Sequence, residues 1–304
     1  MGMGQDFSTD FSKEKVCLNL IPLEINSSHF LSMMFYDKKA AKLFLEPLVE
    51  AQGIYSPTFF FNKQRDRGLL VWSELVVVKG WLTNKYTYSL EGAWVKEGAQ
   101  IYRETICYLN ADTIPKLSGC VIDSHDHATV IWFFTEKGKL KLKATSNREG
   151  KWSIPVDISA PTEIVEDALV LCDDAGNILV IWTTKRKERE SLFCHAYKPV
   201  GEAWILAEEI SLPGDHRLPK LGHDHAGHFV VAWTFREKES DSVWGATFST
   251  KDRKWSDIRK LSPEGEKCLG SALSFSESGK AYIGWVNFTH PLESKIQVAQ
   301  LIVD

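Results

Sequence analysis

The stretch Gly176-Asn177-Ile178-Leu179-Val180-Ile181-Trp182-Thr183 decides the fold, because its pattern returns along the chain. Each copy is an apolar run that ends in tryptophan, and the five copies end at Trp72, Trp132, Trp182, Trp233 and Trp285. The last four tryptophans lie 50, 51 and 52 residues apart. A second series follows with nearly the same period, formed by Trp94, Trp152, Trp204 and Trp255. An internal repeat of this length indicates stacked copies of one small structural unit.

Each full repeat predicts four short strands. In the repeat around Trp182 they are expected at 168–172, 178–183, 191–197 and 204–210, with turn residues between them. The runs that end in tryptophan are apolar at nearly every position, whereas a half-exposed antiparallel strand would alternate, so both faces need cover. The sequence therefore predicts an all-β, six-bladed β-propeller, with a five-bladed ring as the alternative, in which tryptophans fill the gaps between blades.

The turn between the first two strands follows from residue chemistry. A short polar residue stands nine positions before the tryptophan and a glycine six before it, as in Asp173 with Gly176 and Asp224 with Gly227. A polar residue that bonds back to the backbone, followed three positions later by one that tolerates positive φ, is typical of a type I turn closed by a bulge. We therefore expect tight hairpins.

The repeats divide the whole chain, so residues 1–304 are predicted to be a single propeller domain. The units are expected at about 17–50, 57–105, 115–160, 163–211, 217–262 and 269–304, and the second carries an insertion at 74–85. The last unit has no fourth strand, and residues 7–16 are predicted to supply it and close the ring. In the five-bladed alternative the first unit is only an extension.

Composition limits the partners and the compartment. A net charge of -4 and a pI of about 6.2 argue against nucleic acid as a partner. The sequence contains no apolar stretch long enough for a membrane span or a signal peptide, and its six cysteines are not closely paired. A cytoplasmic protein is therefore expected, with export without a cleavable signal peptide as the alternative. We also expect a monomer without a cofactor.

Recurring short motifs carry a resemblance. Residues 173–182 contain Asp-x-x-Gly followed by an apolar run that ends in tryptophan. Gly-x-x-Trp follows at 201–204, Ile-Ser at 210–211 and, in the next repeat, Leu-Ser at 261–262. This succession resembles the Trp-containing propeller repeats of bacterial proteins related in architecture to sialidases and fucose lectins. The resemblance covers about 250 residues and concerns architecture; the sialidase Asp-box, Ser-x-Asp-x-Gly-x-x-Trp, is not reproduced.

Two kinds of residue could carry chemistry. His-Asp-His occurs at 125–127 and 223–225, and imidazole with carboxylate suits zinc, but the copies fall at different turn positions. We expect no metal, with His223 and His225 as the pair that would bind one.

A glycosidase needs two acids about 5 to 10 Å apart. The acids in the loops between repeats do not recur at one position, so no catalytic residue is expected; they are Glu163, Glu166, Asp167, Asp215, Glu264 and Glu266.

The loops between the second and third strands carry charge and one aromatic residue, as a binding rim would. The sequence thus favours a non-catalytic scaffold that engages a protein partner through Trp81, Lys79, Lys85, Lys185, Arg186, Lys187, Arg189 and Arg236. A lectin-like carbohydrate-binding propeller is the first alternative, and it would need tryptophans exposed in pockets. A glycoside hydrolase related to sialidases is the second alternative, and it would need acids that converge.

Overall fold

A computed structural model describes residues 9–10, 15–25, 28–37, 42–51, 53–64, 67–78, 85–96, 102–109, 113–136, 138–160, 164–187, 190–210, 214–236, 241–290 and 293–301. These residues form strands and turns and contain no helix, so no helix that could span a membrane is found among them. The prediction of an all-β chain is confirmed.

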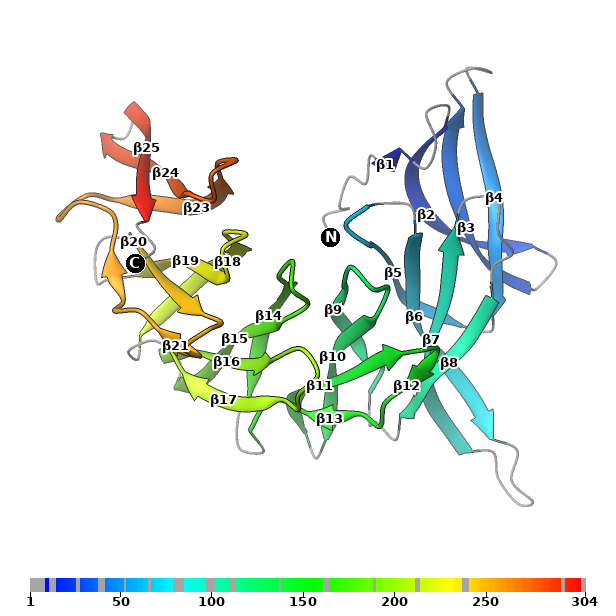
Figure 1. The fold of residues 1–304 in the computed structure, drawn as a ribbon. Helices are drawn as coiled ribbons and strands as arrows, with labels where there is room; N and C mark the ends of the chain where they lie inside the picture. Colours follow the sequence, from blue (N-terminus) through cyan, green and yellow to red (C-terminus); the bar gives the residue numbers. More distant parts are fainter. Residues whose placement is uncertain are drawn as a thin grey trace. The chain divides into compact units, whose positions relative to one another are not determined.

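The described strands form six antiparallel sheets (Figure 1). Sequence neighbours pair within them, except that β13 pairs with β11 and β22 with β20. The first sheet contains β1 (Thr9–Asp10), β2 (Lys15–Ile25), β3 (Ser28–Asp37) and β4 (Lys42–Ala51). The second contains β5 (Ile54–Phe61), β6 (Arg67–Val78), β7 (Lys85–Lys96) and β8 (Tyr102–Leu109). The third contains β9 (Lys116–Ile122), β10 (Ala128–Glu136), β11 (Lys139–Arg148), β12 (Lys151–Trp152) and β13 (Val156–Asp157).

The remaining three sheets repeat this order. The fourth contains β14 (Val165–Cys172), β15 (Ile178–Lys187), β16 (Glu190–Lys198) and β17 (Ile205–Glu209). The fifth contains β18 (Asp215–His223), β19 (His228–Arg236), β20 (Asp241–Ser249), β21 (Lys254–Trp255) and β22 (Arg259–Lys260). The sixth contains β23 (Cys268–Phe275), β24 (Ala281–His290) and β25 (Glu293–Leu301). By contacts the chain divides into two compact units, residues 1–138 with 143–156, and residues 139–142 with 157–304.

The predicted turn features recur in four described hairpins. The amides of Asp126, Gly176 and Gly279 donate to the carbonyls of Asp123, Asp173 and Ser276, and all three donors have positive φ. The side chain at the opening position also takes part, since Asp173 Oδ1 accepts from the amides of Ala175 and Asn177. In the turn that opens at Asp224, the carboxylate accepts from two amides and Gly227 has a φ of 98°, but His225 also has a positive φ, of 61°.

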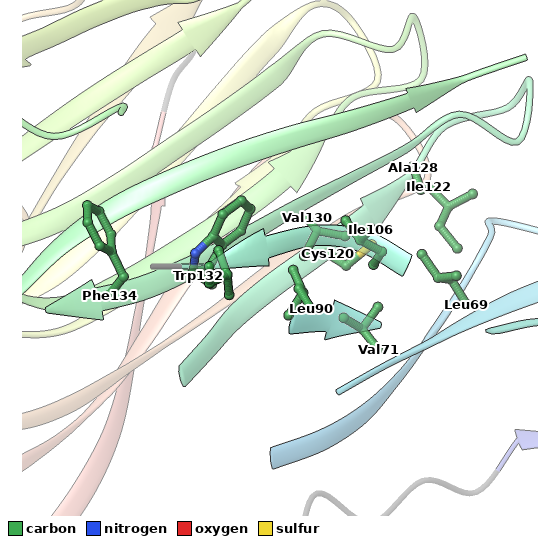
Figure 2. Packing of buried hydrophobic residues seen from close by; sticks show 11 residues of the cluster. Leu69, Val71, Leu90, Ile106, Cys120, Ile122, Ala128, Val130, Trp132 and Phe134 are labelled. Carbon is green, nitrogen blue, oxygen red and sulfur yellow. The ribbon is translucent and has the colours of Figure 1, made fainter. Parts of the chain in front are cut away.

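Tryptophan packing between sheets follows the prediction within each unit. Trp132 is fully buried and joins Leu69 and Val71 of β6 in one apolar cluster with Ile122 and Val130 (Figure 2). In the second unit, Trp233 packs with Leu179, Ile181 and Phe193 of the fourth sheet, and Trp285 packs with residues of the fifth. Each of these indoles is therefore a spacer that covers the preceding sheet.

The described N-terminal strand extends the first sheet, because β1 pairs with β2 through Thr9 opposite Cys17. A hairpin between neighbouring segments closes a short loop, which costs little entropy. Closure of the last sheet by residues 7–16 stays a prediction. Of the insertion at 74–85, residues 74–78 continue β6 and Lys85 begins β7, and residues 79–84 lie outside the described residues.

Removing a spacer should destabilise the protein strongly. Trp233→Ala should lower the free energy of unfolding by about 3 to 5 kcal/mol, because it leaves a cavity between two sheets. Trp204→Ala is the matched control, since Trp204 is only half-buried, and it should cost clearly less. Urea unfolding of both variants measures the difference, and equal losses would contradict the spacer role.

Asp224 should make stability depend on pH. Burial has the largest single effect on the pKa of Asp224 and by itself would raise it. Hydrogen bonds from the amides of Ala226 and His228 and from the His228 ring together outweigh burial, so the pKa of Asp224 lies below its usual value. A lowered folded-state pKa adds stability above about pH 4, and this stability disappears as pH falls through the lowered value. Asp224→Asn should therefore destabilise the protein at pH 7 and lose that deficit in strong acid, as measured by urea unfolding across pH.

Candidate functional site

Two glutamates and an arginine meet on one face of the second sheet. Glu74 lies on β6, Glu91 on β7 and Arg103 on β8. In the register of β6 and β7, Glu91 stands opposite Trp72, and in the register of β7 and β8 it stands opposite Thr105. Since residues two apart on a strand share a face, Glu74, Glu91 and Arg103 point to the same side of the sheet.

One guanidinium joins the two carboxylates. Arg103 donates from Nη2 to Glu74 Oε2 at 2.6 Å and from Nε to Glu91 Oε2 at 3.2 Å. Trp72 Nε1 donates to Glu74 at 3.3 Å, and Thr105 Oγ1 donates to Glu91 at 3.2 Å. The side chains of Glu74 and Glu91 are only 10% and 3% exposed, whereas that of Arg103 is 37% exposed. The acids are thus held in fixed positions behind a partly accessible cation.

The fourth, fifth and sixth sheets carry no charged residue at these two positions. The residue opposite the tryptophan is Cys194 in the fourth sheet, Trp244 in the fifth and Gln297 in the sixth. Two positions after the tryptophan, where Glu74 stands, these sheets have Thr184, Phe235 and Asn287. A buried charge is costly unless it is paired, so two buried acids at positions that are uncharged in three later sheets indicate a role beyond packing.

The sequence did not single out this acid pair, although a signal is present. Glu74 and Glu91 lie inside strands that are otherwise apolar, Leu69 to Val78 and Leu90 to Val95, and not in the loops where acids were sought. A charged residue at a core position of one repeat, where the last three repeats are uncharged, is the pattern that could have found it. Only the strand register brings the two acids to one arginine.

The loop acids do not form a site in the described residues. Glu166 lies 3.9 Å from Lys185, and Glu264 is an exposed partner of Lys260. Asp215 forms a bidentate pair with Arg217, and the hydrogen bond from Arg217 holds the pKa of Asp215 below its usual value. Glu266 accepts a hydrogen bond from Gln297. Asp167 is exposed, and Glu163 lies outside the described residues.

The predicted binding rim is not assembled in the described residues. Trp81, Lys79 and Arg189 lie outside the described residues; Lys85 begins β7, and Arg186 and Lys187 are near the end of β15. Arg236 is paired with Asp241 through two bonds, at 2.8 and 3.0 Å. The proposed protein-binding residues thus remain a prediction from sequence.

The second His-Asp-His motif brings three potential metal ligands together. His223 and His225 converge with Asp174, and His225 Nδ1 lies 2.6 Å from Asp174 Oδ2. In the other copy, His127 bonds to Asp123, which also accepts from the amides of its own turn. The two copies of His-Asp-His therefore have different surroundings.

Comparison with known proteins gives likenesses of structure. No protein-family model matches the chain, and no curated protein matches it. A protein of unknown function from Dyadobacter fermentans is similar with a TM-score of 0.49 and 8% identity, covering 95% of this chain and 91% of that one. Polysaccharide lyase Uly1 has a TM-score of 0.45 and 9% identity, covering 95% and 88%. The NanB sialidase of Streptococcus pneumoniae has a TM-score of 0.43 and 8% identity, covering 90% and 62%.

The prediction of a non-catalytic scaffold for a protein partner is wrong. Where the similar solved structures have a stated activity, that activity is directed at carbohydrates, as in the polysaccharide lyase, an endo-arabinase and an arabinofuranosidase. Two cations of the expected rim are close to acids of this chain, Lys185 to Glu166 and Arg236 to Asp241. A carbohydrate ligand was the alternative reading of the same sequence.

Removing the bridging arginine tests the cohesion of the acid cluster. Arg103→Ala should lower the free energy of unfolding by about 1 to 3 kcal/mol, because it leaves two buried carboxylates without their cation. Arg236→Ala, which breaks an exposed pair, is the control and should change stability little. Urea unfolding compares them, and an Arg103→Ala protein as stable as the control would show that the cluster contributes nothing.

Proposed function

We propose that this protein cleaves glycosidic bonds and that Glu74, Glu91 and Arg103 form its reactive centre. The observation that carries the proposal is the pair of buried carboxylates, Glu74 and Glu91, held by one guanidinium. Most glycoside hydrolases use two carboxyl groups on either side of the scissile bond, one as general acid and one as base or nucleophile. The substrate is a carbohydrate.

The geometry supports separate roles for the three residues. Glu74 is the more exposed of the two acids, at 10% against 3%, and it is assigned as the general acid that protonates the leaving oxygen. Glu91 is assigned as the base or nucleophile, since Thr105 and Arg103 hold its carboxylate in place. Arg103 offers N–H donors on its accessible side, and a planar guanidinium suits an anionic group such as a sugar carboxylate.

An exposed aromatic side chain on the same face fits a sugar ligand. Tyr108 stands opposite Ser89 in the register of β7 and β8, and Ser89 shares its face with Glu91. Tyr108 is 71% exposed. Aromatic rings combine an apolar face with a polar edge, so this tyrosine could stack on a sugar ring beyond the reactive centre.

A lectin built on the repeated tryptophans is less well supported. Such a lectin needs indoles exposed in pockets, but Trp72, Trp132, Trp182, Trp233 and Trp285 are all buried. Their surface is used for packing between sheets within each unit. Of the two carbohydrate readings, the hydrolase has the more specific support.

For the fold, we propose that the six sheets are the blades of one six-bladed propeller. Six up-and-down sheets, five of them with the same tryptophan at the same strand position, support this number. A ring of blades would give the spacer of each sheet a neighbour to cover. The single domain 1–304 remains part of this proposal.

The proposal predicts a large loss of activity from one isosteric change. Glu91→Gln should lower kcat/KM by about 10²- to 10⁴-fold, because an amide cannot act as base or nucleophile. Hydrolysis of a panel of polysaccharides and chromogenic glycosides by the full chain, followed by reducing-end assay, measures the effect. Glu74→Gln should be similarly impaired on substrates with poor leaving groups and less so on activated aryl glycosides.

A matched control separates catalysis from folding. Glu264→Gln changes an exposed acid and should leave turnover unchanged. Thermal unfolding of all three variants should show that Glu91→Gln remains folded at the assay temperature. If no substrate of the panel is turned over, or if Glu91→Gln retains full activity, the assignment fails.

A further inference from the structure

The structure assigns a divalent transition-metal site to Asp174, His223 and His225, on the turns of two neighbouring sheets. Asp174 lies in the turn between β14 and β15, and the two histidines flank Asp224 at the turn between β18 and β19. All of these residues belong to the second compact unit. This inference does not depend on the proposed glycosidase activity.

The three side chains already converge. One ligand atom from each of the three lies within 4.8 Å of the others. His225 Nδ1 is 2.6 Å from Asp174 Oδ2, and His223 Nε2 is 4.0 Å from Asp174 Oδ1. The two imidazole rings have centroids 4.7 Å apart and are nearly perpendicular. With bonds of about 2.0 to 2.2 Å to nitrogen and oxygen, a zinc ion needs only small side-chain rotations to draw these atoms together.

Neighbouring carboxylates hold the two turns. In the first turn, Asp173 takes this role, because its Oδ1 accepts two amide bonds and its Oδ2 accepts from Asn177 Nδ2. In the second turn, Asp224 takes the same role through Ala226 and His228. Asp174 follows Asp173 directly, and His223 and His225 flank Asp224, so the candidate ligands are carried on well-held turns.

The second turn departs from the repeat in the way the site requires. In the described turns at 123–127, 173–177 and 276–280, positive φ falls on the fourth residue and not on the second. His225, the second residue of its turn, has a φ of 61°, a conformation that is uncommon for a residue with a side chain. This conformation accompanies the approach of the His225 ring to Asp174 of the neighbouring sheet.

The donor set indicates the class of metal. Two imidazoles and one carboxylate suit zinc and other first-row divalent ions, and oxygen-preferring calcium or magnesium much less. Three protein ligands leave at least one position for water or a ligand. Because the ligands come from two sheets, a bound ion would also cross-link the fourth and fifth sheets.

The chain contains a near-copy that serves as an internal control. Asp123, His125 and His127 also lie within 4.8 Å of one another, but all three come from a single turn. Both carboxylate oxygens of Asp123 accept bonds within that turn, Oδ1 from two amides and Oδ2 from His127 Nδ1. A metal there would have to compete with the bonds that hold the hairpin.

The experiment is metal titration of the full, untagged and metal-stripped chain. Zn²⁺ should bind at one ion per chain, and Co²⁺ should give the visible absorption of a site with nitrogen and oxygen ligands. Asp174→Asn and His225→Ala should each weaken Zn²⁺ binding by at least about tenfold, since each removes a ligand. His125→Ala should bind as the unchanged protein does.

Thermal unfolding with and without Zn²⁺ gives a second readout. The ion should raise the melting temperature of the unchanged protein and of His125→Ala, but not that of Asp174→Asn. Asp174→Asn retains the size of a surface side chain, so it keeps the test valid if His225→Ala folds poorly. A chain that binds no stoichiometric Zn²⁺, or one whose binding survives Asp174→Asn but not His125→Ala, overturns the site.

Discussion

The packing of tryptophan between neighbouring sheets is the constraint on which the rest of the structure depends. Each central strand is apolar on both faces and would be unstable in water on either side. Trp132, Trp233 and Trp285 fill the space against the preceding sheet in clusters that include both partners. A side chain of this size buries about 150 to 250 Å². The close fit therefore sets which strand positions can vary and which cannot.

The residues that differ most in character between the sheets lie at positions that the packed tryptophans do not occupy. The second sheet replaces uncharged neighbours of its tryptophan with Glu74 and Glu91, and Arg103 compensates both. The fourth and fifth sheets place Asp174 beside His223 and His225 at the hairpin tips. One cluster lies at mid-sheet and the other at the turns, so a reactive centre and a metal site can coexist on one repeated scaffold without sharing a residue. Function is carried by such local departures and not by the fold.

The sequence was more informative about strands and turns than about the site. Strand type follows from the alternation of apolar runs and turn residues, and the Asp-x-x-Gly hairpins follow from local hydrogen bonding, so both were predictable. The candidate site was not, because acids were sought in loops, where charge is common, and Glu74 and Glu91 lie within strands. The pairing of the N-terminal strand with β2 was not predicted either, since local pairing competes with pairing to a distant edge.

The sequence by itself determined the period of the repeat, the all-β class and the burial of the recurring tryptophans, because these are properties of short, local patterns. Only the tertiary structure decided which polar residues meet. Glu91 faces Trp72 through the register of β6 and β7, and Asp174 reaches His225, 51 residues away, because two sheets pack side by side. Contacts of this kind depend on register and packing, which a single sequence does not specify.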